Sequence, residues 1–172
     1  MVTDDVLLLR MVWHPSHFKI EQLTGRAELS GAAFDSADLL GKPDKEGNPR
    51  YVSVDDKQLV TQESVDANIT NQQSHGKDVR LDRHMPRFVS VYAGRVRQCP
   101  VEQDGQFFDF TREPIEPSDN YPANPAHCAL RACHILEYQQ MEKPAQTLAV
   151  QKMRAELLQA VDAIMTYEEA LT

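Results

Sequence analysis

The chain has 172 residues, of which 41% are hydrophobic and 26% are charged, and its formal net charge is −8 at neutral pH. This composition excludes wholesale disorder, and the length suits a single domain over residues 1–172. Lys and Arg are scattered through an acidic chain, whereas proteins that hold nucleic acid directly carry basic stripes. Direct nucleic-acid binding is therefore not expected.

The same composition indicates a cellular compartment. No window contains the roughly 20 apolar residues that cross a bilayer. Asp4 and Asp5 lie where a signal peptide needs positive charge. Cys99, Cys128 and Cys133 are an odd number of cysteines at uninformative spacing, which argues against a disulfide framework. We therefore expect a cytoplasmic protein without a membrane span.

Apolar runs predict the strands of the N-terminal half. Residues 5–13 (DVLLLRMVW) form a nearly continuous apolar run that is typical of a central strand, and His14-Pro15 ends it because proline cannot donate to a ladder. The other elements predicted here are a strand or tight turn at 29–34, a loop at 41–50, a short strand at 51–54, a helix that begins at Asp55-Asp56 and a loop at 68–77.

The C-terminal half predicts a hairpin, an extended connector and a long helix. Residues 88–96 are rich in aromatic and β-branched residues, and a turn at 102–105 leads to their predicted hairpin partner at 107–110. Four prolines make 113–125 an extended connector, and 127–136 is interpreted as a strand rather than a helix. Pro144 starts an amphipathic helix over about 144–168. The predicted fold is α+β, a mostly antiparallel sheet with this C-terminal helix packed on it.

Histidines are the main candidates for chemistry, because phosphate loops and the familiar hydrolase and metalloprotease motifs are absent. His14 (with His17 beside it), His84 and His127 could act as acids or bases. For His14, His17 and His84, a place in a surface turn is the simpler interpretation, whereas a site that uses His127 with distant partners stays open. Residues 127–134 (HCALRACH) hold both zinc donor types, but a strand divides them between two faces, so no metal site is predicted.

Three other polar residues are candidate ligand contacts. Arg10 interrupts an apolar strand and must meet a carboxylate or a ligand anion, with a structural ion pair the simpler alternative. Ser53 could cap the following helix or contact a ligand. Asn124 could stabilise its own turn or contact a ligand.

These residues also carry a resemblance. The pattern Leu9-Arg10, His14-Pro15, Ser30-Gly31-Ala32-Ala33-Phe34, Val52-Ser53-Val54, His84 and Asn124-Pro125-Ala126-His127 resembles a family of small uncharacterised bacterial proteins with LRR…HP, SSAAF, MSV and NPAHA motifs. Gly31 replaces the second serine of that family, and residues 42–50 form a charged insertion. The resemblance implies a bacterial, cytoplasmic origin and adds Ser30 to the ligand-binding candidates, but it transfers no activity or cofactor.

A weaker likeness concerns the leading strand with Arg10, followed by the short strand with Ser53. It is similar to the opening of ADP-ribosyltransferase-like folds, such as the RES-type toxins and RNA 2′-phosphotransferases, in which this position holds a nicotinamide dinucleotide.

Two functional hypotheses follow. In the first, the chain is a binding or accessory protein with a protein partner, such as an effector of a conflict system. In the second, it is a small enzyme whose site gathers three histidines, His14, His84 and His127, near Arg10 and Ser53. Arg10 would bind a phosphate-bearing or NAD-like substrate, and one of the histidines would act as general acid or base. The enzyme hypothesis requires at least two of the histidines to share a cleft with Arg10.

Overall fold

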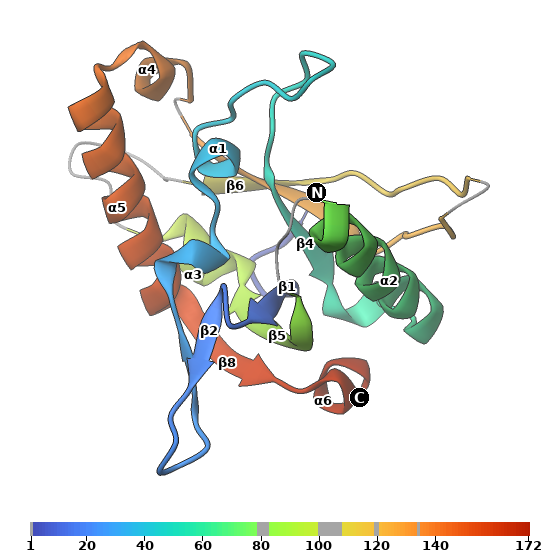
Figure 1. Cartoon of the computed structure of the whole chain (residues 1–172). Helices are drawn as coiled ribbons and strands as arrows, with labels where there is room; N and C mark the ends of the chain where they lie inside the picture. The colour runs from blue at the N-terminus through green and yellow to red at the C-terminus, as the bar shows by residue number, and fades with distance from the viewer. Residues whose placement is uncertain (1, 79–82, 100–107, 119–120, 134) are drawn as a thin grey trace.

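A six-stranded antiparallel sheet forms the centre of the fold (Figure 1). The computed structural model describes residues 2–78, 83–99, 108–118, 121–133 and 135–172. In hydrogen-bonded order the strands are β6 (Phe108–Arg112), β7 (His127–Ala132), β4 (Val52–Asp56), β1 (Leu7–His14), β5 (His84–Tyr92) and β8 (Val161–Met165). The inner position of β1 confirms the predicted central strand.

Helices and a short hairpin complete the fold. The hairpin of β2 (Phe18–Ile20) and β3 (Ala27–Leu29) extends away from the sheet (Figure 1). The helices are α1 (Ser36–Leu39), α2 (Gln62–Asp78), α3 (Ala93–Arg97), α4 (Ile135–Gln140), α5 (Lys143–Ala160) and α6 (Tyr167–Leu171), with 3₁₀ turns at Gly31–Ala33 and Lys57–Leu59. None of the helices in the described ranges is both long enough and apolar enough to cross a bilayer.

Strand alternation divides the apolar side chains of β1 between two cores. Leu8 and Val12 pack with Met153 and Leu157 of α5 in the larger core. Leu9, Met11 and Trp13 face the other side and form a smaller core with α2 and α6. Because β1 is apolar on both faces, it needs helices on both faces of the sheet. The predicted α+β class, an antiparallel sheet with a C-terminal helix packed on it, is confirmed.

Two predicted boundaries are wrong because tertiary contacts override local pattern. The polar stretch 68–77, predicted as a loop, belongs to α2. Val65 and Ile69 pack this helix against the smaller core, and its Gln72 accepts a hydrogen bond from the Trp13 indole. The C-terminal helix ends at Ala160 rather than near 168. The chain then enters β8, whose main chain at Ala163 exchanges hydrogen bonds with the Ser90 hydroxyl of β5.

Strand pairing also differs from the prediction. The strand predicted over 88–96 ends at Tyr92, and 93–97 form α3, in which Arg95 pairs with Asp162 and Arg97 with Asp4 and Asp109. β6 pairs with β7 instead of returning as the hairpin partner of β5. The predicted turn at 102–105 lies outside the described residues.

Other element boundaries are corrected as well. The strand at 127–136 is confirmed only as far as Ala132, because α4 begins at Ile135. Asp55 and Asp56 end β4, and α2 starts at Gln62, so the predicted helix begins later than expected.

Candidate functional site

One face of β4 and β7 carries the polar residues that the sequence singled out. Asp55 lies opposite His127 in the antiparallel register, and Ser53 lies opposite Ala129. Because side chains alternate along a strand, Ser53, Asp55 and His127 point to the same side. The intervening Val52 and Val54 are buried in the larger core on the other side.

His127 is held by main chain on one side and meets a hydroxyl on the other. Its Nδ1 lies 2.7 Å from the carbonyl oxygen of Glu113, and its Nε2 lies 3.1 Å from Ser53 Oγ. A carbonyl oxygen can only accept, so Nδ1 carries the hydrogen. In the neutral ring Nε2 is then unprotonated and accepts the hydroxyl hydrogen of Ser53. His127 is 4% exposed while Ser53 is exposed, so the arrangement presents a hydroxyl to solvent with a base buried behind it.

Asn124 fixes the chain just before His127. Its Nδ2 donates to Asp55 Oδ1 at 2.9 Å, and its Oδ1 accepts from the Ala126 amide at 3.1 Å. Asn124 is buried, and its hydrogen bond with Ala126 is buried while that with Asp55 is partly buried. Burial raises the pKa of Asp55, while the Asn124 hydrogen bond and the nearby His127 act in the opposite direction. This carboxyl group therefore lies beside the imidazole with a position set by hydrogen bonds.

A pocket of ≈ 570 Å³ is lined by Tyr51 and Glu113, the two residues that contact the His127 ring from its other sides, although Ser53, Asp55 and His127 are not among its lining residues. Tyr51 lies edge-on to His127 with 5.7 Å between ring centroids, and the guanidinium of Arg131 lies 4.8 Å from the Tyr51 centroid. Arg131 also forms a two-pronged ion pair with Glu113, at 2.5 and 3.1 Å, which lowers the pKa of Glu113. The remaining lining residues are Asp38, Asp44, Asn48, Pro49 and Arg50. The pocket thus carries charges of both signs.

The other two predicted histidines lie elsewhere. His14 pairs directly with His84 at the end of β1 and β5, and the His14 ring is edge-on to Phe18 of the larger core at 5.5 Å. His127 is on β7, two strands from β1, at the level of Leu9. The structure therefore brings His14 and His84 together but keeps both apart from His127.

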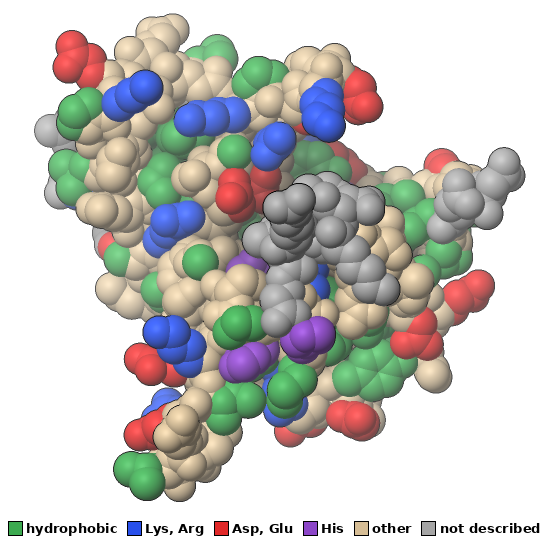
Figure 2. All heavy atoms as spheres, viewed as in Figure 1, with side chains coloured by type: hydrophobic (Ala, Val, Ile, Leu, Met, Phe, Trp, Pro, Cys, Tyr) green, Lys and Arg blue, Asp and Glu red, His purple; other side chains and the backbone are tan. Residues whose placement is uncertain are grey.

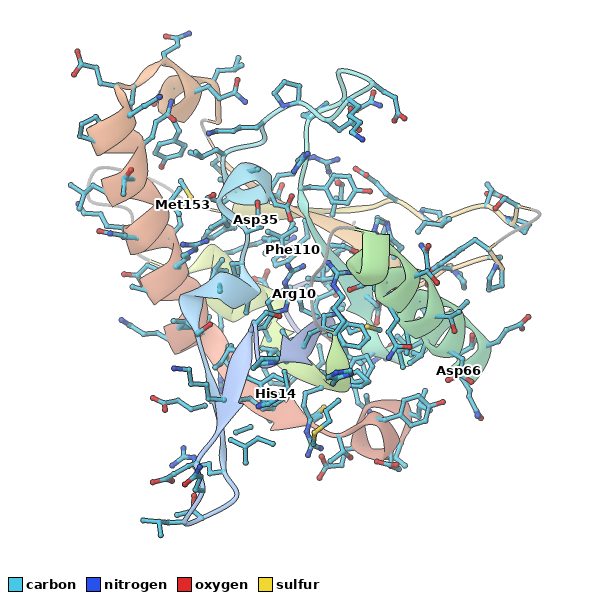
Figure 3. The ribbon with its side chains drawn as sticks, viewed as in Figure 1. Arg10, His14, Asp35, Asp66, Phe110 and Met153 are labelled. Carbon is cyan, nitrogen blue, oxygen red and sulfur yellow. The ribbon has the colours of Figure 1, made fainter. Side chains whose placement is uncertain are left out.

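Arg10 contacts protein rather than open space (Figure 3). Its Nε donates to the Ala33 carbonyl at 2.7 Å, its Nη1 donates to the Ser53 carbonyl at 3.0 Å, and its guanidinium lies over the Phe34 ring. Ser30 donates from its hydroxyl to the His17 carbonyl. Both residues thus join segments of the chain, and their predicted roles in ligand binding remain predictions.

No protein-family model, curated protein or solved structure matches the chain. The site is therefore defined by its geometry. Across the described ranges, no group of three or more His, Cys, Asp or Glu side chains is placed to hold a metal ion. His134, the last residue of the HCALRACH segment, lies outside them.

Part of this site is not evident from the sequence. Local pattern predicts Asp55 at the start of a helix and does not mark Tyr51, Glu113 or Arg131 as site residues. The alternation of Tyr51, Ser53 and Asp55 with valines is a strand signal that places all three on one face. No local signal connects them to Glu113 and Arg131, which come from the extended connector and β7.

Proposed function

We propose that this protein is an enzyme in which Ser53 acts as a nucleophile and His127 as its general base. The observation that carries the proposal is the orientation of His127, with Nδ1 held by a carbonyl and Nε2 directed at an exposed hydroxyl. Serine is a weak nucleophile until a neighbouring base accepts its proton, and this pairing supplies that base. Sequence alone favoured a binding protein because it contained no complete motif, whereas the proposed pair joins residues 74 positions apart.

The reaction class is acyl transfer or hydrolysis. Ser53 Oγ bonds to the carbonyl carbon of an ester or amide while its proton passes to Nε2 of His127. His127 then gives that proton to the leaving group as the bond to the carbonyl carbon breaks. A water molecule next attacks the carbonyl carbon of the acyl-serine while His127 takes its proton. The bond from that carbon to Ser53 Oγ then breaks, His127 returns the proton to Oγ, and the acid is released. Asp55, opposite His127 in the sheet, stabilises the imidazolium that forms in both steps.

The pocket favours a small polar substrate with charges of both signs. Arg131 is already paired with Glu113. Burial raises the pKa of Asp38, and the charges of Arg10 and Arg50 act in the opposite direction. Three carboxylates and two guanidinium groups therefore line the pocket. This balance disfavours a highly anionic NAD-like substrate there and suits a zwitterionic ester or amide.

The direct test is labelling with a fluorophosphonate reagent followed by peptide mapping. An activated serine displaces fluoride from phosphorus, so the wild-type protein should be modified at Ser53. Ser53→Ala should abolish that modification, and His127→Gln should slow it by about 100-fold or more, the usual contribution of a general base. Ser118→Ala, an exposed serine away from the pair, is the matched control and should label like the wild type.

A wild-type protein that is folded by circular dichroism but unlabelled at Ser53 would refute the enzyme proposal. The alternative is then the binding or accessory protein, and affinity capture with the intact chain becomes the next experiment.

A further inference from the structure

A second pocket, of ≈ 400 Å³, lies between α1 and α5. We call it the α1–α5 pocket; it is lined by Ser36, Leu40 and Lys42 on one side and by the face of α5 from Lys143 to Arg154 on the other. Its volume falls in the range of small-molecule sites, roughly 300–1,000 Å³. It contains none of the residues of the Ser53–His127 site.

The charge of this pocket is opposite to that of the chain. Lys42, Lys143 and Arg154 contribute three positive charges, and no Asp or Glu is among the described lining residues. The chain as a whole carries −8. Within the described ranges no carboxylate forms an ion pair with any of the three cations. A concave surface concentrates the field of like charges, so an anion is attracted here even though the protein is acidic.

The cations are placed by one helix face and one loop. The pocket residues of α5 recur every three or four positions, which places them on one side of the helix: Lys143, Thr147, Val150 and Arg154. Lys143 and Arg154 are 11 residues apart, so at 1.5 Å per residue they are separated by about 16 Å along the helix axis. Lys42 is positioned opposite, because its amide donates to the Ala37 carbonyl and the Gln139 amide donates to the carbonyls just before it. Figure 2 shows Lys and Arg side chains over α5 and the segment after α1.

The two ends of the pocket differ in chemistry. Lys42 and Lys143 lie at the start of α5, where the helix dipole adds to the attraction for an anion. Arg154 is at the far end, where its Nε is already bonded to the Phe34 carbonyl at 2.8 Å and its terminal nitrogens remain as donors. Leu40 and Val150 supply an apolar wall between the ends.

We propose that the α1–α5 pocket binds a phosphate-bearing small molecule of about nucleoside diphosphate size, with its phosphates between Lys42 and Lys143. Lysine ammonium groups bind phosphate as point charges, and the distance to Arg154 leaves room for the rest of such a ligand. The inference does not rest on the Ser53–His127 pair, because neither residue lines the α1–α5 pocket.

The test is isothermal titration of the full-length protein with ADP, pyrophosphate and citrate. ADP or pyrophosphate should bind with a micromolar dissociation constant that weakens with added salt, and citrate should bind at least about tenfold more weakly. The Lys42→Gln, Lys143→Gln double variant should lose about tenfold or more in affinity. A Lys19→Gln, Lys45→Gln double variant removes the same charge from exposed lysines outside the pocket and should bind like the wild type.

Several results would overturn the proposal. They are the absence of ADP and pyrophosphate binding at millimolar concentration, equal losses in the two double variants, and citrate binding as tight as that of pyrophosphate. Ser53→Ala should bind ADP like the wild type, so failure of the enzyme proposal and failure of this one are separate outcomes.

Discussion

Replacing Arg10 with methionine tests whether this arginine is a structural clamp or a ligand-binding residue. Met keeps much of the length and apolar contact of the side chain but removes the guanidinium. Arg10→Met therefore breaks the hydrogen bonds to the Ala33 and Ser53 carbonyls and the contact with the Phe34 ring. If these contacts join β1 to β4 and to the segment after β3, the variant must be less stable.

The expected loss is about 3 kcal/mol of unfolding free energy. The partly buried bond to Ala33 accounts for about 1.5–2 kcal/mol, since the donor is charged. The bond to Ser53 is exposed and is worth about 0.5–1 kcal/mol, and the contact with Phe34 adds about 0.5 kcal/mol. With a urea m-value of about 2 kcal/mol/M, the unfolding midpoint should fall by about 1.5 M.

Trp13 provides the assay. It is the only tryptophan and is fully buried, with its indole donating to Gln72, so its fluorescence reports unfolding. Arg10→Lys, which keeps the charge but not the forked donors, should lie between the wild type and Arg10→Met. A loss below about 0.5 kcal/mol for Arg10→Met would refute the clamp and favour the ligand-binding role predicted from the sequence.

Two further predictions concern stability. Burial lowers the pKa of His17 to about 4, and its neutral Nδ1 accepts the Trp13 amide hydrogen at 3.2 Å. Because the unfolded value is about 6.5, the folded state binds fewer protons, and stability should fall by about 2 kcal/mol as pH drops from 6.5 to 4. His17→Asn keeps an acceptor that does not titrate and should lose this dependence in urea titrations at pH 7 and 4.5; an unchanged pH slope would contradict the assignment. A Cβ on Gly94 would lie 2.8 Å from Asp4 Cβ and 3.0 Å from Asp4 O, so Gly94→Ala should cost about 1–3 kcal/mol by urea titration. Gly31→Ala, which meets only the flexible Arg154 side chain, should cost less, and equal losses would show that the Asp4 contact is unimportant.

The elements that follow from sequence are those with a strong local cause. The apolar run around Leu9 identified a strand buried on both faces, and Pro144 marked the beginning of α5. Glycine and proline placed the loop at 41–50, where Gly41 and Gly47 have positive φ. In each case the signal lies within a few residues, so no distant contact is needed to interpret it.

Where α5 ends and where α2 extends were decided by tertiary contacts. Val161, Ile164 and Met165 suit either a helix face or a strand, and hydrogen bonding to β5 selects the strand. The weakly apolar α2 is a helix because its few apolar residues reach the smaller core.

The candidate site depends most on the three-dimensional fold. His127, Ser53 and Asn124 were recognised individually from sequence, but the sequence-based hypothesis grouped His127 with His14 and His84. Sheet order places β4 between β1 and β7, and the β4–β7 register brings Ser53 to His127. Strand order and register arise from the packing of whole faces against helices, a property of the complete chain. Sequence therefore determined which residues could do chemistry, and only tertiary structure determined which of them meet.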